Sequence, residues 1–237
     1  MTDSPTLPAC CSPPQTRWLL PRPLAGVHLA STRFDPARLD PDDFQRWGIA
    51  PLEAATKRQA EYLAGRICAH AALRQATGTP AIPAIGADRA PCWPAGATGS
   101  ITHGAGFAAA ITARREQWQG LGLDVEKRLT TARADRLVEQ ILTSRELQAY
   151  RALDDEGRAL LLTLTFSIKE SLFKALYPLV NRRFYFQDAE LLAHSEEGHA
   201  RLRLLADLSP AWRSGAQLEG QFALFDDYLL SLVGIPA

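Results

Sequence analysis

Hydrophobic and polar residues repeat with a helical period over residues 166–177. At about 100° per residue, the apolar side chains form one wide arc. The opposite, wettable side carries Ser167, Ser171 and Lys174. Lys169 falls inside the apolar arc, and Glu170 lies at its edge. A buried charge is costly unless it is paired or binds a ligand. Either Lys169 extends to water and Glu170 pairs with Lys174, or both charges serve a site at the rim of a cleft.

Strict alternation over residues 121–126 predicts a strand. One face is apolar and contains Leu121, Leu123 and Val125. The other face carries Asp124 and Glu126, roughly 7 Å apart, and Gly122 should leave open space beside them. Two carboxylates without a basic residue between them suit a hard cation such as Mg²⁺, and Glu170 would complete the set. A solvated strand face is the alternative for the pair alone.

The same patterns predict the other elements. Helices are expected at 51–77, where Gly78 ends the helix, at 135–151, and at 156–177, where Pro178 ends it. Strands are expected at 27–34, 100–103, 107–112, 118–126, 184–192, 200–205, 217–225 and 228–233, with a loop over 79–99. This order predicts an α+β fold of two lobes, 24–126 and 127–237, after an irregular Pro-rich arm at 1–23.

Composition and net charge limit the partners and the cellular compartment that we expect for this chain. A chain of 237 residues forms one large domain or two small ones, and its net charge of zero favours neither nucleic acid nor an acidic membrane as a partner. The four cysteines show no Cys-x-x-Cys spacing, which favours a reducing cytoplasm over a disulfide scaffold or a zinc site. Neither a membrane-spanning stretch nor a signal peptide is expected.

Two motifs resemble those of a known family. Gly122-Leu123-Asp124-Val125-Glu126, followed by Phe166-Ser167-Ile168-Lys169-Glu170-Ser171-Leu172-Phe173-Lys174, resembles the signature of the 4′-phosphopantetheinyl transferases of the long, two-lobed type. Surfactin and enterobactin synthase activators typify this type. Further similar pieces are Glu61-Tyr62-Leu63-Ala64-Gly65-Arg66 and Ser100-Ile101-Thr102-His103. This chain has Arg89-Ala90-Pro91 where the family usually has Gly-Lys-Pro.

The resemblance implies lobes related by a pseudo-two-fold axis, each with a small antiparallel sheet packed on a long helix, and a ligand cleft between them. It implies transfer of the 4′-phosphopantetheine arm of coenzyme A to a serine of an apo acyl or peptidyl carrier protein, with release of 3′,5′-ADP by a monomeric enzyme. Mg²⁺, with Mn²⁺ as a substitute, would be held by Asp124, Glu126 and Glu170. The base that takes the serine proton would be Glu170, Lys169 or Glu146. The residues implied to bind coenzyme A are Arg46, Arg58, Arg66, Arg89, Ser100, Thr102, His103, Asp124 and Lys174.

A basic stretch follows the metal motif and consists of Lys127, Arg128, Arg133 and Arg136. Cations where a helix begins oppose its dipole, so this stretch is either shaped for an acidic carrier protein or is a solvated helix face. Two other functions compete with the transferase. A Mg²⁺-dependent phosphohydrolase could use the same carboxylates, and an inactive carrier- or nucleotide-binding module should lack one of them.

Overall fold

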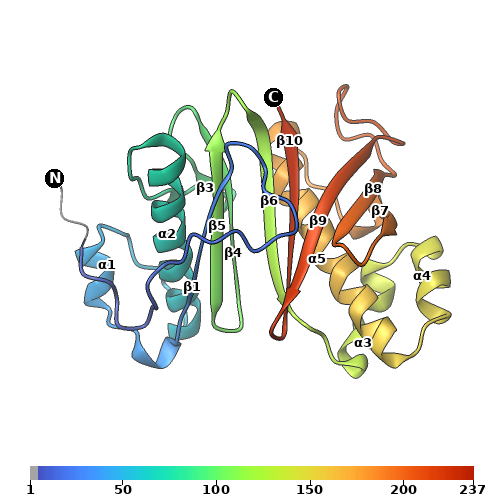
Figure 1. Ribbon diagram of the computed structural model, residues 1–237, viewed down its shortest axis with the longest axis horizontal. Helices are drawn as coiled ribbons and strands as arrows, with labels where there is room; N and C mark the ends of the chain where they lie inside the picture. The colour runs from blue at the N-terminus through green and yellow to red at the C-terminus, as the bar shows by residue number, and fades with distance from the viewer. Residues whose placement is uncertain (1–4) are drawn as a thin grey trace. The chain divides into compact units, whose positions relative to one another are not determined.

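The computed structural model describes residues 5–237 and divides the chain into two compact units (Figure 1). The first unit comprises Ala25–Gln117 and the preceding segment up to Trp18. The second comprises Leu19–Leu24 and Trp118–Ala237. Each unit contains an antiparallel sheet packed on one long helix, which confirms the predicted α+β class. Among residues 5–237, no helix has both the length and the apolar character needed to cross a membrane.

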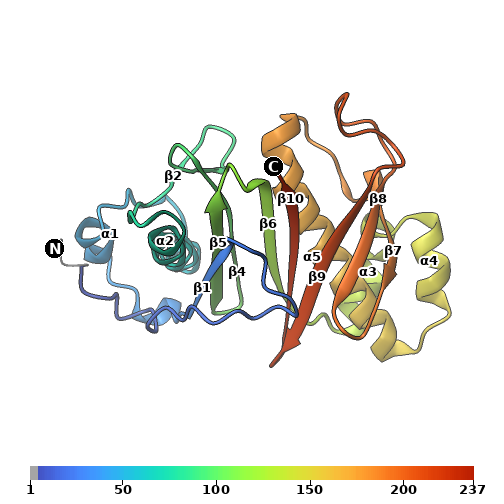
Figure 2. The same ribbon diagram turned by 45° about the horizontal axis from the view of Figure 1, so that its top comes forward.

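The first unit is built on a three-stranded sheet with the order β1-β5-β4. Its strands are β1 (His28–Arg33), β5 (Phe107–Arg114) and β4 (Ala97–Gly104). Helix α2 (Thr56–Thr77) covers one face of this sheet, and Figure 2 shows it almost along its axis. Gly78 ends α2 in the left-handed conformation, as predicted (φ +77°). The short elements are η1 (Pro36–Arg38), α1 (Asp42–Arg46), β2 (Ala84–Ile85) and β3 (Pro91–Cys92).

The second unit is built on a five-stranded antiparallel sheet with the order β6-β10-β9-β8-β7. Its strands are β6 (Trp118–Lys127), β7 (Ala189–His194), β8 (His199–Leu204), β9 (Gln217–Phe225) and β10 (Tyr228–Pro236). Helix α5 (Asp155–Val180) runs along one face of the sheet and contributes Leu164, Ile168 and Leu172 to the core. The remaining elements are α3 (Thr131–Ile141), α4 (Ser144–Arg151) and η2 (Phe186–Asp188).

Helix α5 lies unusually close to β6, and this corrects two predictions. A Cβ atom at Gly122 would lie 1.8 Å from the carbonyl oxygen of Ser171, so Gly122 provides backbone contact and not open space. Ser167 and Ser171 are fully buried, although the sequence predicts a wettable side. Their hydroxyls lie 2.7 and 2.8 Å from the hydroxyl of Ser231 on β10. The serines therefore satisfy one another's polar groups inside the helix–sheet contact.

Several predicted boundaries also differ from the structure. The predicted helix 135–151 is two helices, because Thr143 caps α4 through the backbone N–H of Glu146. Pro178 lies within the last turn of α5, which ends at Asn181 in the left-handed conformation. Helix α2 begins at Thr56, after a turn, and residues 186–188 form η2 before β7 begins.

The boundary between the units lies at Gln117, and not at residue 127, because β6 pairs with β10 of the second sheet. The part of the N-terminal arm that the structure describes is divided between the two units. Residues up to Trp18 belong to the first unit, whereas Leu19–Leu24 belong to the second. The amide of Gln221 accepts from Arg22 N and donates to Arg22 O, both at 2.9 Å, which fastens this second segment to β9. Residues 1–4 of the predicted arm lie outside the described residues.

Candidate functional site

The predicted metal-binding carboxylates all belong to the second unit, on β6 and α5. The sequence prediction assigned Asp124 and Glu126 to the first lobe, which the boundary at Gln117 corrects. Asp124 is buried at 5% exposure, and its Oδ1 accepts a hydrogen bond from Lys174 Nζ at 2.6 Å. The same ammonium donates to the carbonyl oxygen of Leu123 at 3.1 Å. Lys174 thus joins α5 to β6 and does not pair with Glu170 as the alternative reading proposed.

Asp124, Glu126 and Glu170, here called the carboxylate group, influence one another electrostatically. Burial, followed by the charge of Asp124, raises the pKa of Glu126 to about 7. Burial is also the main cause that raises the pKa of Glu170, again with a contribution from Asp124. Lys174 opposes both shifts. Burial and mutual repulsion thus oppose full ionisation of the group, and a bound cation would favour the ionised form.

The donor chemistry of the carboxylate group suits a hard divalent cation, because all its ligand atoms are oxygens. In the part of the chain that the structure describes, no three histidine, cysteine or acidic side chains already converge as a metal site. Lys174 holds Asp124 in this arrangement. A metal bound by Asp124 would compete with the ammonium for this carboxylate.

A pocket of ≈ 180 Å³ lies beside Glu170. Its walls are mainly aromatic and include Phe173 of α5 and the segment Phe184–Phe186 that follows this helix. The rings of Phe173 and Phe184 lie 5.2 Å apart, and those of Phe166 and Phe186 lie 5.3 Å apart. Lys169 and Arg183 add cations to the lining. The pocket can accept a small, partly apolar group beside Glu170.

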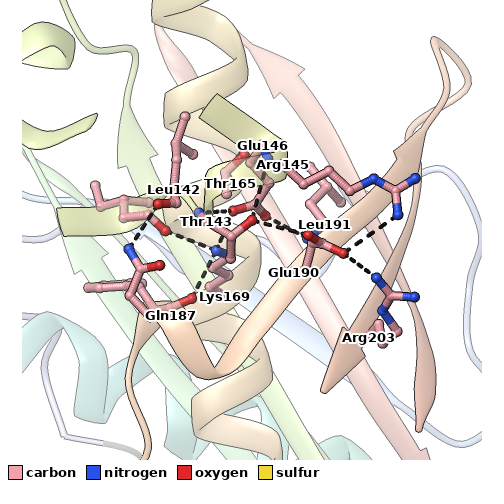
Figure 3. Close-up of polar contacts among 12 residues, drawn as sticks. Leu142, Thr143, Arg145, Glu146, Thr165, Lys169, Gln187, Glu190, Leu191 and Arg203 are labelled. Atoms are coloured by element: carbon pink, nitrogen blue, oxygen red, sulfur yellow. Dashed lines mark hydrogen bonds and ion pairs between the residues drawn. The ribbon is translucent and has the colours of Figure 1, made fainter. Parts of the chain in front are cut away.

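Lys169 points away from water into a polar network within the second unit (Figure 3). Its side chain is 2% exposed, although Lys169 is also among the residues that line the pocket beside Glu170. Nζ donates to Glu146 Oε2 at 2.7 Å and to the carbonyl oxygens of Ile141 and Phe186, both at 2.9 Å. Burial lowers the pKa of Lys169, and the charge of Glu146 opposes this shift. Lys169 is therefore a paired, enclosed cation.

Glu146 and Glu190 surround this cation and are themselves buried. Glu146 accepts from the backbone N–H groups of Thr143 at 2.7 Å and Leu191 at 2.6 Å. Glu190 accepts from the Thr143 hydroxyl at 3.2 Å and from Arg203 at 2.7 Å. Glu190 and Arg203 were not predicted from the sequence, since a strand glutamate carries no local signal of burial. The Thr143-x-x-Glu146 capping pattern was the available signal for Glu146.

The first unit brings together His103, Arg58 and Glu61. Arg58 Nη1 lies 2.7 Å from His103 Nε2 and 3.2 Å from Glu61 Oε2. Because a guanidinium can only donate, Nε2 accepts, and the ring proton is left on Nδ1. Nδ1 lies 3.5 Å from Glu61 Oε2. Arg58 is half exposed, so its charge is oriented by two partners and remains accessible.

The other residues of the first unit that were predicted to bind coenzyme A lie in surroundings that differ from those of Arg58 and His103. Arg66 is buried at 5% exposure with its guanidinium over the ring of Tyr62, so it does not project as an exposed cation. Arg46 is paired with Asp40 and Asp43. Ile101 faces Gly65 of α2, so strand alternation directs His103 to that same face and directs the buried Ser100 and Thr102 to the other. Arg89 lies in the exposed turn between β2 and β3.

The basic stretch spans the end of β6 and the first turns of α3. Arg128 forms an ion pair with Glu156 at 2.8 Å, and Lys127 lies 3.8 Å from Asp227. Arg133 and Arg136 are exposed on α3, and Arg133 is close enough to lower the pKa of Glu126. Two of the four cations therefore have acidic partners within the unit, and two face solvent, of which Arg133 lies near the carboxylate group.

Comparisons with known proteins agree with the division into two units. Residues 50–113 match the 4′-phosphopantetheinyl transferase N-terminal domain, and residues 120–233 match the 4′-phosphopantetheinyl transferase superfamily. Enterobactin synthase component D of Escherichia coli (strain K12) is 42% identical over 158 residues, which cover 65% of this chain and 72% of that protein. 4′-Phosphopantetheinyl transferase PptT of Mycobacterium tuberculosis is 37% identical over 150 residues, with 60% and 62% covered.

A third relative extends the similarity over most of the chain. 4′-Phosphopantetheinyl transferase Npt of Nocardia iowensis is 28% identical over 220 residues, which cover 88% of this chain and 96% of that protein. The matched residues include the whole carboxylate group and Lys174. The chain therefore belongs to the 4′-phosphopantetheinyl transferase superfamily, enzymes that transfer the phosphopantetheine arm of coenzyme A to carrier proteins.

Proposed function

We propose that this transferase moves 4′-phosphopantetheine from coenzyme A to a serine of an apo acyl or peptidyl carrier protein and uses Mg²⁺ held by Asp124, Glu126 and Glu170. The observation that carries the proposal is the all-oxygen carboxylate group beside Lys174 and an aromatic pocket. Mg²⁺, or Mn²⁺ in its place, would supply positive charge to the diphosphate of coenzyme A. Lys174 would then leave Asp124 and pair with a diphosphate oxygen.

The proton of the carrier serine needs an acceptor near the attacked phosphorus. The serine oxygen forms a bond to the β-phosphorus while the bond from that phosphorus to the oxygen of 3′,5′-ADP breaks. Both oxygens of Glu146 already accept hydrogen bonds, and the Lys169 ammonium is enclosed. Glu170 lines the pocket, which supports its assignment as the acceptor of this proton.

Coenzyme A also carries a 3′-phosphate, for which we propose Arg58 and His103 as ligands. Arg58 is oriented by Glu61 and His103 and is half exposed, which supports this role. Arg46 is engaged by two carboxylates, and Arg66 is buried on an aromatic ring. The aromatic pocket beside Glu170 would receive the pantetheine arm, whose amides and methyl groups match walls of phenylalanine and tyrosine.

A direct test is to mix the protein with coenzyme A, Mg²⁺ and several apo carrier proteins from fatty-acid, polyketide and siderophore synthesis. We expect the intact mass of at least one carrier to increase by one phosphopantetheine group. A carrier whose acceptor serine is replaced by alanine should stay unchanged, and removal of Mg²⁺ with a chelator should stop the reaction. If no carrier gains this mass while the folded protein binds coenzyme A, the proposed function is wrong.

We predict that reversing Arg133 and Arg136 to glutamate raises the KM for the carrier protein roughly tenfold and weakens its salt dependence. Both arginines are exposed on α3, whereas Arg128 is already paired with Glu156. The KM for coenzyme A should change much less than the KM for the carrier, because only Arg133 acts on Glu126. Arg151 is an exposed arginine on α4, so Arg151→Glu reverses a surface charge elsewhere in the unit and serves as the control. It should leave the KM for the carrier and the KM for coenzyme A unchanged. Equal losses for coenzyme A and carrier would instead implicate these arginines in the nucleotide site.

We also place the reaction in the cytoplasm and expect a monomeric enzyme. All four cysteines are free thiols, including the neighbours Cys10 and Cys11, whose sulfur atoms lie 3.7 Å apart. Thiols in this state suit a reducing compartment. Sedimentation of the purified protein with and without coenzyme A would test the expected monomer.

A further inference from the structure

Lys169 connects three segments of the second unit that are distant in sequence. Its ammonium has three N–H donors, and each has an acceptor: the carbonyl of Ile141 at the end of α3, the carboxylate of Glu146 in α4, and the carbonyl of Phe186 at the start of η2. All three distances lie between 2.7 and 2.9 Å. An ammonium with all its donors engaged is suited to hold neighbouring groups in place.

The acceptors around Lys169 are themselves held by a second set of contacts (Figure 3). Glu146 Oε1 accepts from the N–H of Leu191 at 2.6 Å, which attaches the start of β7. Glu190, the preceding residue, accepts from Arg203 of β8 at 2.7 Å and from Thr143 at 3.2 Å. The buried ends of α3, α4 and β7 therefore converge on one cation. Removing the cation would leave a buried carboxylate and two carbonyls without their charged partner, which is costly.

The segment Phe184–Phe186 is the part of this arrangement that reaches the pocket. It lies between α5 and β7 and, at Phe184 and Tyr185, precedes the first turn of η2. Its side chains line the pocket together with Glu170. The backbone of the segment is fixed by the Lys169–Phe186 bond, and the next residue, Gln187, donates to the carbonyl of Leu142 at 2.9 Å. The aromatic wall therefore depends on the polar contacts of Lys169, which itself borders the pocket, and of Gln187.

We propose that Lys169, oriented by Glu146 and Glu190, is a positioning residue that holds the Phe184–Phe186 wall against Glu170 and thereby sets the affinity for the pantetheine arm of coenzyme A. This inference rests on the proposed function, in which the pocket receives that arm. It differs from the role as a proton acceptor that the sequence leaves open for Lys169. The contacts of Lys169 act on the shape of the pocket, and not on the transferred proton.

The test replaces Lys169 with methionine, which keeps the length of the side chain and removes the charge. We expect the KM for coenzyme A to rise about tenfold, the loss typical of one charge-assisted contact. The dissociation constant of 3′,5′-ADP, which lacks the arm, should change less than about twofold, and kcat at saturating coenzyme A should fall less than KM rises. Amide hydrogen exchange over residues 184–188 should become faster. Lys169→Arg, which keeps the charge, should restore part of the affinity.

Two further variants keep the test decisive. Ile235→Ala removes a buried side chain of β10, which is separated from β7 by β8 and β9, and serves as the control for a general loss of stability. It should lower the Tm without changing exchange at 184–188 or the KM for coenzyme A. If Lys169→Met does not fold, Glu190→Gln weakens the same network from the side remote from the pocket and should give the same pattern in a milder form.

The outcomes separate this inference from the proposed function. If Lys169→Met lowers kcat but leaves the KM for coenzyme A and the amide exchange at 184–188 unchanged, Lys169 acts in the chemical step. If the variant lowers the Tm but leaves kcat and the KM for coenzyme A unchanged, Lys169 gives only structural support. Either result overturns the positioning role. A wild-type protein that binds 3′,5′-ADP but modifies no carrier would contradict the proposed function itself.

Discussion

Replacing Asp124 with asparagine is expected to abolish transfer at ordinary Mg²⁺ concentrations. The amide keeps the size of the side chain but loses the negative charge that we propose to hold the metal with Glu126 and Glu170. Loss of metal stabilisation worth several kcal/mol corresponds to a rate decrease on the order of 10³-fold. The measurement is the rate of mass increase of the carrier, together with Mn²⁺ binding followed by calorimetry, which reports on the site independently of turnover.

The control for this variant is Asp227→Asn. Asp227 is an exposed aspartate at the turn before β10, and its contact with Lys127 is long, at 3.8 Å. This substitution changes the net charge by the same amount and should leave the rate and Mn²⁺ binding unchanged. Because Lys174 pairs with Asp124, the asparagine variant also loses an ion pair, so its Tm must be measured as well. Near-normal turnover of a folded Asp124→Asn protein would refute the metal assignment.

Gly122→Ala is expected to have the largest effect on stability. The new methyl carbon would lie 1.8 Å from the carbonyl oxygen of Ser171 and 2.7 Å from the backbone nitrogen of Ala175. These are backbone atoms of α5, so the whole helix must move away from β6. Overpacking typically costs about 1–3 kcal/mol and more where the neighbour is rigid backbone, so we expect the second unit to lose cooperative folding or to unfold at a clearly lower urea concentration.

A matched substitution is available within the same unit. At Gly157, in the first turn of α5, a new methyl carbon would meet only side-chain atoms of Asp154 and Leu153, at 3.0 Å or more. Gly157→Ala should therefore be tolerated, and alanine has the higher helix propensity. Comparable losses at positions 122 and 157 would show that the helix–strand distance is not the cause. If Gly122→Ala folds but is inactive, the displaced helix has separated Glu170 and Lys174 from Asp124.

The main elements could be predicted because their signals are local. Alternation along β6 correctly directed Leu121, Leu123 and Val125 to a core, and all three are at most 1% exposed. The helical period of residues 166–177 likewise identified α5. The break between α3 and α4 was missed because apolar periodicity continues across Leu142, although the Thr143-x-x-Glu146 pattern marks a new helix start.

The partner of each charge could not be predicted in the same way. Lys169 lies in the apolar arc of α5, as its spacing predicts, but its acceptors come from α3, α4 and η2. Lys174 reaches Asp124 across a separation of 50 residues. Such contacts depend on where packed elements meet, and side-chain periodicity within one element does not encode that position.

The candidate residues Asp124, Glu126, Glu170 and Lys174 could be placed on one strand face and one helix from the sequence, because alternation and the helical period are local patterns. The packed fold placed these residues in one unit, because β6, which the sequence assigned to the first lobe, pairs with β10 of the second unit. It also decided that Gly122 is a contact and not a gap, because α5 approaches β6 at Ser171. The physical reason is the same in both cases: strand pairing and helix packing join segments far apart in the chain, and the free energy of those contacts is absent from any local pattern.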